Sequence, residues 1–396
     1  MIQQAEAVRN RGESCPDTTP LVVDLDGTLL RTDLFLESSL RLIKRMPWVV
    51  LLMPLWLLRG RAYLKHKIFR RVQTDVSLLP PHEELLAWLR DEKARGRHLV
   101  LATASDYHQA CSVVEPLGLF DTVLGSDGQR NLKGRQKLET IVEVCGEKFD
   151  YVGNSSSDLE IWRGCRHAIL VNTSRRVERS ARRAGNVVRV FPRSFTGFRD
   201  ALRSMRFYQW VKNLLLFVPA ITSHTIYDIS VAGNATLAFL SFGFAASAGY
   251  ILNDLLDLEE DRRHPTKKQR PFASGRASIG SGILLAIASL SFSAVIATMV
   301  PPAFLSALIP YLTLTSLYSL FLKRLLVVDV LTLALLYTLR VIAGSAATGI
   351  VLSPWLLSFA FFLFLSLAFS KRAADLIQHQ QDNRKAVLGR GYVTTD

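Results

Sequence analysis

A charged stretch between two apolar runs contains residues suited to binding a cation together with phosphate groups. It runs from Asn253 to Gly275 and reads NDLLDLEEDRRHPTKKQRPFASG, with acids first and bases after them. Asp254, Asp257 and Asp261 recur at i, i+3 and i+7, so a helix continuing from the preceding apolar run would place them on one face. Like charges at that spacing repel, and carboxylate oxygens suit Mg²⁺, which is usually shared with substrate phosphates. The stretch therefore predicts a Mg²⁺ and phosphate site, with a solvated loop between membrane helices as the alternative.

A second group of polar residues lies beside apolar runs further along the chain. Tyr318 begins a segment that ends in Lys323 and Arg324, and Asp329 follows soon after. Arg340 lies deeper, inside an apolar run, where an unpaired charge is costly. Arg340 is therefore expected to face a cavity with an acidic or phosphate partner, unless it snorkels to the interface.

The composition indicates a soluble half followed by a membrane half. The chain has 396 residues, 49% of them hydrophobic, and a mean hydropathy of +0.20. It is mixed up to about Asp200 and strongly apolar beyond Trp210. The net charge of +14 is explained by bases that flank the apolar runs. The basic stretches lack the interleaved aromatic residues of a nucleic-acid module, so no nucleic-acid partner is expected.

Six apolar runs approach the length of about 20 residues that a bilayer requires. The connections after the second, fourth and sixth runs carry Lys and Arg, whereas those after the first, third and fifth carry none. The positive-inside rule then places the charged loops and the N-terminal half in the cytoplasm, and the chain in the inner membrane as a multi-pass protein. The predicted spans are 210–227, 231–252, 279–300, 303–322, 327–347 and 352–370.

The N-terminal half contains two carboxylates suited to phosphoryl transfer. The apolar run Leu21–Val23 predicts a buried strand, and the sequence DLDGT follows it from Asp24 to Thr28. On an extended backbone, the side chains of Asp24 and Asp26 point the same way. They can share Mg²⁺, while one attacks phosphorus and the other serves as acid and base.

Further apolar runs predict a parallel sheet with a ligand site at the carboxyl ends of its strands. The run His98–Ala102 leads to the hydroxyls of Thr103 and Ser105, and Lys137 follows downstream. A third strand at 151–152 runs into GNSSSD at 153–158, and two more strands are expected at 168–171 and 187–190. Helical patterns separate most of these runs, which favours a parallel sheet.

The order of DLDGT, Thr103, Lys137 and GNSSSD resembles the haloacid dehalogenase (HAD) superfamily over residues 20–192. The resemblance implies a Rossmann-like α/β domain with a parallel sheet and a helical cap, and a Mg²⁺-dependent phosphatase. By this resemblance, Asp24 would be the nucleophile and Asp26 the general acid and base. Phosphate ligands would be Thr103 and Lys137, and metal ligands Asp24, Asp26, Asn154 and Asp158. Asn154 stands where the family usually has an acid, so a regulatory or scaffolding domain is the alternative.

An insert at about 33–79 predicts the cap. It contains the apolar run MPWVVLLMPLWLL at 46–58, which is too short to span a bilayer and has bases on both sides. It is interpreted either as a helix of the cap that dips into the membrane surface or as an ordinary core helix of the cap. An arginine-rich segment at 193–209 predicts an amphipathic linker helix on an anionic leaflet. Residues 1–19 are polar and expected to be disordered.

The membrane half, 210–396, resembles the UbiA prenyltransferase superfamily through NDxxDxxxD at 253–261 and the trailing HPTKKQRPFASG. The segment QWVKN at 209–213, the Tyr318 loop and Ala343–Gly344 favour its decaprenyl-phosphate phosphoribosyltransferase branch. The resemblance implies an all-α multi-span membrane bundle with Mg²⁺ held by Asp254, Asp257 and Asp261. The expected substrate- and phosphate-binding residues are Lys212, Asn213, Asn253, Lys267, Arg270, Tyr318, Lys323, Asp329, Arg340, Lys371 and Arg372. The superfamily usually has more membrane helices, so the polar stretch 378–396 is expected to lead to further spans, unless another subunit closes the bundle.

Together these features predict Mg²⁺-dependent transfer of phosphoribose from phosphoribosyl pyrophosphate (PRPP) to a polyprenyl phosphate at the cytoplasmic face of the bilayer. The product would carry a monophosphate that the HAD domain could remove. The alternative is an ordinary UbiA prenyltransferase that moves a polyprenyl group from its diphosphate to an aromatic acceptor. A third possibility, from another class, is a non-catalytic membrane scaffold.

Overall fold

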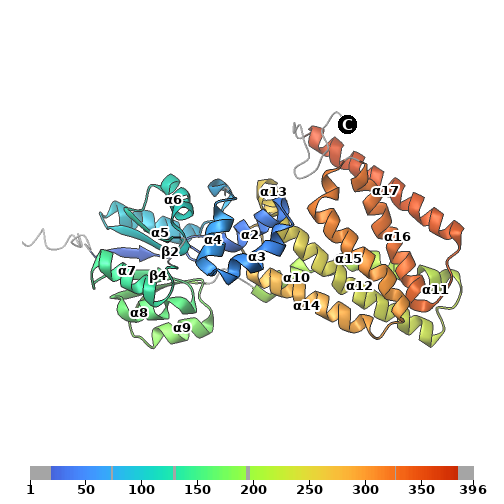
Figure 1. The fold of residues 1–396 in the computed structure, drawn as a ribbon, viewed down its shortest axis with the longest axis horizontal. Helices are drawn as coiled ribbons and strands as arrows, with labels where there is room; N and C mark the ends of the chain where they lie inside the picture. The colour runs from blue at the N-terminus through green and yellow to red at the C-terminus, as the bar shows by residue number, and fades with distance from the viewer. Residues whose placement is uncertain (1–18, 73–74, 128–130, 193–196, 326, 382–396) are drawn as a thin grey trace, which may run out of the picture. The chain divides into compact units, whose positions relative to one another are not determined.

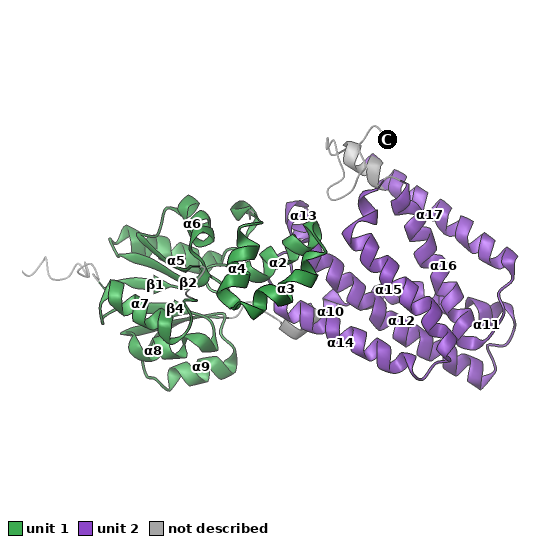
Figure 2. Cartoon of the chain, in the orientation of Figure 1, with its two compact units in different colours: residues 1–194 green, residues 195–396 purple. Residues whose placement is uncertain are grey.

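The chain separates into two compact units. The structure is a computed structural model that describes residues 19–72, 75–127, 131–192, 197–325 and 327–381. Contacts divide it into unit 1, Met1–Ser194, and unit 2, Phe195–Asp396 (Figure 2). Disorder was expected for residues 1–19, of which 1–18 lie outside the described residues, as does the end of the polar C-terminal stretch.

Unit 1 is built on a parallel sheet of six strands, as the sequence predicts. The strand order is β3-β2-β1-β4-β5-β6, and β1 is central, with Val22 opposite Val100 on one side and Tyr151 on the other. Sequence analysis missed β3, a short strand next to β2. The strands are β1 Leu21–Val23, β2 Leu99–Asp106, β3 Thr122–Ser126, β4 Asp150–Gly153, β5 His167–Val171 and β6 Val187–Phe191.

Helices cover both faces of this sheet (Figure 1). Alternate residues of β1 enter different cores, because successive side chains of a strand point to opposite faces. Leu21 and Val23 pack with residues of α5 and α6, whereas Val22 packs with residues of α7, α8 and α9. These helices are α5 Glu83–Ala94, α6 Tyr107–Val114, α7 Arg135–Cys145, α8 Leu159–Gly164 and α9 Arg175–Arg182. Unit 1 therefore has the three-layer α/β architecture expected of a HAD domain.

A helical insert follows β1 and forms the cap. Its helices are α2 Leu34–Arg45, α3 Val49–Leu58 and α4 Arg61–Phe69. Asp33 caps α2 by accepting a hydrogen bond from the amide of Leu36 at 3.0 Å. The three helices share a small core of Leu42, Val49, Ile68 and Val72.

Unit 2 is helical, and its described residues include five helices long and apolar enough to cross a membrane. They correspond to the second to sixth predicted spans, and the chain is therefore a multi-pass membrane protein. These helices are α12 Ile229–Leu256, α14 Ile279–Ala297, α15 Leu305–Leu320 together with the preceding 3₁₀ helix η6 Pro302–Phe304, α16 Val328–Thr348 and α17 Pro354–Gln381. The linker segment forms the short helix α10, Gly197–Ser204.

The first predicted span, 210–227, does not form a single long helix. The chain there forms a 3₁₀ helix, η4 Phe207–Phe217, followed by the short helix α11 Val218–Thr222. Pro219 lacks an amide hydrogen to donate, and the polar side chain of Asn213 is drawn into the bundle, where it is only 1% exposed. The segment therefore packs against other helices of unit 2 as two short helical elements and is not among the five long apolar helices.

Close backbone contact holds η4 against α16. A Cβ atom on Gly344 would lie 2.0 Å from the carbonyl oxygen of Leu216. A Cβ atom on Gly243 of α12 would lie 2.7 Å from the ring of Trp210. Two glycines on two membrane helices thus create the space that η4 occupies.

We predict that Gly344→Ala destabilises unit 2 by about 3 kcal/mol, because the added methyl group would force the backbone of η4 away from α16. Thermal unfolding of the whole chain in detergent micelles would measure the effect. Gly233→Ala is the matched control, since open space surrounds Gly233 on α12. Equal unfolding temperatures for the two variants would contradict this account of the packing.

Candidate active sites

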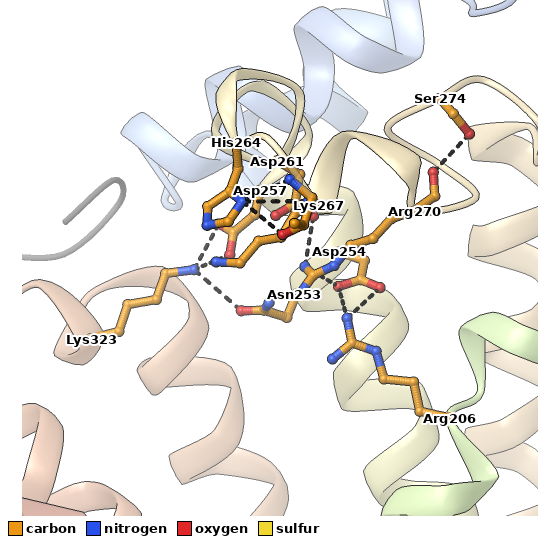
Figure 3. A network of polar contacts seen from close by, with 11 residues as sticks. Arg206, Asn253, Asp254, Asp257, Asp261, His264, Lys267, Arg270, Ser274 and Lys323 are labelled. Carbon is orange, nitrogen blue, oxygen red and sulfur yellow. Dashed lines mark hydrogen bonds and ion pairs between the residues drawn. The ribbon is translucent and has the colours of Figure 1, made fainter. Parts of the chain in front are cut away.

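The three carboxylates of the charged stretch lie where α12 passes into α13, Leu258–Arg263. Asp254 is on the last turn of α12, Asp257 ends that helix, and Asp261 is on α13. The amide of Asp257 donates to the carbonyl of Asn253 at 3.0 Å, and the amide of Asp261 donates to the carbonyl of Asp257 at 2.8 Å. Helical hydrogen bonding thus continues across the junction, and all three carboxylates join one polar network (Figure 3).

Two arginines neutralise part of this network. Nη2 of Arg206 lies 2.6 and 2.8 Å from the two carboxylate oxygens of Asp254. Nη1 of Arg270 bridges two acids, at 3.0 Å from Asp254 and 2.7 Å from Asp261. Burial raises the pKa of Asp261 to about 6, with the negative charge of Asp254 adding to the rise and Arg270 opposing it.

Lys323 neutralises the third carboxylate from another part of the chain. It lies in the 3₁₀ helix η7, Leu322–Arg324, at the end of α15. Its Nζ is 2.7 and 2.5 Å from the carboxylate oxygens of Asp257 and 3.2 Å from Oδ1 of Asn253 (Figure 3). The ends of α12 and α15 are therefore joined by a partly buried ion pair, which keeps both charged loops at the same end of the bundle.

A cavity of about 400 Å³ opens beside this network. Ten of the predicted residues line it, together with Arg206, Glu260, Tyr311 and Tyr337. The ten are Lys212, Asn253, Asp257, Asp261, Lys267, Arg270, Tyr318, Lys323, Arg340 and Lys371. Four predicted residues do not line it: Asn213, Asp254, Asp329 and Arg372. Asp254 lies directly behind the lining, in contact with Arg206 and Arg270.

Arg340 faces the cavity from within α16, as one of the two sequence-based alternatives predicts. Its Nε donates to Oδ1 of Asn213 at 3.0 Å, and its Nη2 donates to the hydroxyl of Tyr311 at 3.1 Å. The guanidinium carbon lies 5.2 Å from the centre of the Tyr337 ring. These partners orient the guanidinium without cancelling its charge, so Arg340 can attract an anion in the cavity.

Asp329 and Arg372 form a structural pair beside the cavity. Asp329 is fully buried, and Nε of Arg372 lies 2.5 Å from its Oδ2 atom. The hydroxyl of Tyr318 donates to Oδ1 of Asp329 at 2.7 Å. These contacts link α15, α16 and α17. Because Asp329 and Arg372 neutralise each other, neither charge is directed into the cavity.

The second candidate site lies at the carboxyl end of β1 in unit 1. Asp24 follows the strand and accepts hydrogen bonds from Nζ of Lys137 at 2.6 Å and from Oγ1 of Thr28 at 3.1 Å. Burial raises the pKa of Asp24, and the charge of Lys137 opposes the rise. Lys137 comes from α7, so the fold brings together two residues that sequence analysis paired only through family resemblance.

Asp26 is held in a different way. Oδ1 accepts from the amide of Leu34 at 2.8 Å, and Oδ2 accepts from the hydroxyl of Ser105 at 2.6 Å. Burial, with repulsion from Asp33, raises the pKa of Asp26 to about 7. A carboxyl group with that pKa can give and take a proton near neutral pH.

The loop after β4 completes this site. Asp158 accepts from the amides of Asn154 and Ser155 at 3.1 and 2.9 Å and from the hydroxyl of Tyr151 at 3.0 Å. Asn154 donates to the carbonyl of Asp26 at 3.2 Å. Gly27, with a φ of +74°, allows this approach, because a Cβ there would collide with Asn154.

The cap adds residues that sequence analysis did not place in the site, and β2 contributes Ser105. The cavity measures about 440 Å³ and is lined by Asp24, Asp26, Lys137, Asn154 and Asp158, but also by Phe35, Arg61, Lys65 and Ser105. Nζ of Lys65 donates to the carbonyl of Ala104 at 2.8 Å. Thr103 is buried and does not line the cavity; its hydroxyl accepts from the amide of Ser105 at 3.0 Å. The bases of the insert, which has no Asp or Glu between Ser38 and Thr74, were the available signal for Arg61 and Lys65.

Both sites contain donors that suit Mg²⁺ chemically, since the candidates are carboxylate and amide oxygens. Within the parts of the chain that the structure describes, no three His, Cys, Asp or Glu side chains are arranged to hold a metal ion. The acids of unit 2 contact bases instead. A cation could use these oxygens once the bases have moved to another anion.

Comparison with known proteins identifies the family. A model of the UbiA prenyltransferase family matches residues 215–388. Protein y4nM of Sinorhizobium fredii is 37% identical over 379 residues, which cover 95% of this chain and 73% of that protein. The chain belongs to the UbiA prenyltransferase family. Decaprenyl-phosphate phosphoribosyltransferase of Corynebacterium glutamicum is 32% identical over 188 residues, covering 46% of this UbiA-family chain and 57% of that enzyme.

Solved structures resemble each half of the chain separately. A UbiA homolog from Archaeoglobus fulgidus, bound to DMAPP and Mg²⁺, is 24% identical to this chain. The match covers 48% of this chain and 67% of the homolog, with a TM-score of 0.42. Apo phosphoserine phosphatase is 16% identical and covers 45% of this chain and 95% of that chain, with a TM-score of 0.33. By its own strand order and site residues, this UbiA-family chain joins a transferase domain to a HAD-type domain.

We predict that Arg372→Met lowers the stability of unit 2 by about 3–5 kcal/mol, because the buried carboxylate of Asp329 would lose its charged partner. Thermal unfolding in detergent micelles would measure the loss. Adding Asp329→Asn should recover most of it, since no unpaired charge would then remain. Arg324→Met, at an exposed position, is the control. Unchanged stability in Arg372→Met would refute the structural role.

Proposed function

We propose that unit 2 transfers phosphoribose from PRPP to a polyprenyl phosphate. The observation that carries the proposal is the excess of bases around one cavity. Seven Lys and Arg side chains line it against three acids: Arg206, Lys212, Lys267, Arg270, Lys323, Arg340 and Lys371 against Asp257, Glu260 and Asp261. PRPP brings a diphosphate and a monophosphate, and the lipid brings another phosphate. A prenyl diphosphate with an aromatic acid would bring less negative charge to the same cavity.

The bases would bind phosphates in two groups. Arg206, Arg270 and Lys323 contact the acids of α12 and α13, so they would receive the diphosphate next to the predicted cation site. Lys212 and Arg340, which both contact the ring of Tyr337, would hold a phosphate deeper in the bundle. The similarity to relatives named decaprenyl-phosphate phosphoribosyltransferase supports the proposal of a phosphoribosyl donor and a polyprenyl phosphate acceptor.

Asp254, Asp257 and Asp261 would hold Mg²⁺ when the diphosphate draws Arg270 and Lys323 away from them. The cation would supply positive charge to the departing diphosphate. The bond from the anomeric carbon to the diphosphate oxygen breaks, and a new bond forms from that carbon to an oxygen of the polyprenyl phosphate. Inorganic pyrophosphate leaves, and the ribose keeps its 5-phosphate.

Unit 1 would hydrolyse that remaining monophosphate. Asp24 attacks phosphorus, and the bond to the ribose oxygen breaks as this oxygen takes the proton of Asp26. Asp26 then removes a proton from the water that attacks the aspartyl phosphate, which releases inorganic phosphate and restores Asp24. Lys137, Arg61 and Lys65 would hold the phosphoryl oxygens, and the predicted oxygen ligands Asp24, Asp26, Asn154 and Asp158 would hold Mg²⁺. Both sites would face the cytoplasm at the inner membrane, as the distribution of Lys and Arg predicts.

We expect membranes containing this chain to move radiolabel from PRPP into the lipid phase when polyprenyl phosphate and Mg²⁺ are present. Asp254→Asn should lower the rate about 100-fold or more, because Arg206 and Arg270 lose the acid that positions them. Glu259→Gln is the control; Glu259 contacts Arg263 and does not line the cavity. Label from a prenyl diphosphate in an aromatic acid, with none from PRPP in lipid, would overturn the proposal in favour of ordinary prenyl transfer.

We also expect the wild-type chain to release inorganic phosphate from purified polyprenyl-phospho-ribose 5-phosphate. Asp24→Asn removes the nucleophile and should lower this release at least about 1000-fold while lipid labelling from PRPP continues. The exposed Asp91 of α5 provides a control, Asp91→Asn, which should keep both activities. Equal phosphate release by Asp24→Asn and wild type would exclude unit 1 as the phosphatase.

A further inference from the structure

The cap carries an apolar stripe that no part of unit 1 covers. Helix α3 packs one face on α2 and α4 through Val49, Met53 and Trp56. Trp48, Leu51, Leu55 and Leu58 follow each other by three or four residues and form the opposite face. All four are exposed, Leu51 by 77% and Leu58 by 84%. An exposed stripe of large apolar side chains along a whole helix marks an interaction surface.

The charge around this stripe indicates the partner. Between Ser38 and Thr74 the chain has nine Lys and Arg residues and no Asp or Glu. The bases at the two ends of α3 include Arg45, Arg59 and Arg61, all exposed. Apolar side chains bordered only by bases suit a surface that is apolar below and anionic above, which describes a bilayer with anionic headgroups.

The length of α3 limits how deeply it can enter. Its ten residues extend about 15 Å, half the thickness of the hydrocarbon core. The helix can therefore lie in the interface of one leaflet but cannot cross. Of the two interpretations of the 46–58 run, the exposed stripe favours a membrane-surface helix.

We propose that α3 anchors the cap in the anionic membrane surface and thereby selects a phosphate carried on a lipid. Only Arg59 and Gly60 separate α3 from α4, whose Arg61 and Lys65 line the phosphate cavity of unit 1. Anchoring α3 therefore holds that cavity within reach of the headgroup layer. This selection of substrate rests on the proposed phosphatase function, whereas the anchoring itself does not.

The anchoring can be tested by fluorescence quenching on the whole chain reconstituted in vesicles of phosphatidylcholine and phosphatidylglycerol. A genetically encoded, environment-sensitive fluorophore replaces Leu51 in one sample and Val144 in another. Val144 lies on α7, outside the cap, and is 49% exposed. Lipids with spin-labelled acyl chains should quench the fluorophore at position 51 and leave that at 144 unquenched. If the fluorophore at position 51 is not quenched, the proposal is overturned, because α3 would then face water or another protein surface and not the acyl chains.

The selection of a lipid substrate has a separate test. The double variant Leu51→Ser with Leu58→Ser should hydrolyse polyprenyl-phospho-ribose 5-phosphate in vesicles at least tenfold more slowly than wild type. Its release of phosphate from soluble p-nitrophenyl phosphate should be unchanged, and Val144→Ser should keep both activities. An equal fall with both substrates would mean that the stripe serves only folding and would overturn the selection. If wild type hydrolyses neither substrate, the proposed phosphatase function fails, while the quenching result still decides the anchoring.

Discussion

Charges at the end of a membrane bundle need partners, and this requirement organises unit 2. Three acids at the junction of α12 and α13 are neutralised by Arg206, Arg270 and Lys323, which come from three places in the sequence. Because burying an unpaired charge is costly, the ends of α12 and α15 and the start of η4 must come together. Bases nevertheless outnumber acids in the lining of the cavity, and this excess makes the site attractive to phosphate groups.

Much of both sites could be predicted from sequence because the decisive residues lie within short motifs. Asp24 and Asp26 follow a buried strand, and two residues on a strand share a face whatever surrounds them. Asp254, Asp257 and Asp261 are likewise placed by helical spacing. The five spanning helices were also predictable, since length and hydropathy are properties of the segment itself.

Contacts between distant segments could not be predicted in this way. The segment 210–227 was expected to be one continuous helix because its apolar content outweighed Pro219 and hid the buried role of Asn213. Thr103 was preferred to Ser105 through family resemblance, whereas in the folded chain Ser105 lines the cavity and Thr103 does not. Lys65 lines its cavity only because the cap folds over the sheet. Asp329 does not line the cavity of unit 2, because it is paired with Arg372, which lies more than forty residues later in the sequence.

The presence of two units in one chain has a consequence for the intermediate that would pass between the two proposed reactions. A single polypeptide supplies the sites in equal numbers, whatever the level of expression. A lipid product also diffuses only in the plane of the membrane, so a tethered second site meets it at a high effective concentration. The phosphorylated intermediate would then be consumed close to where it forms, and little of it would accumulate in the bilayer. Covalent fusion thus acts on the lifetime of the intermediate without changing the chemistry of either site.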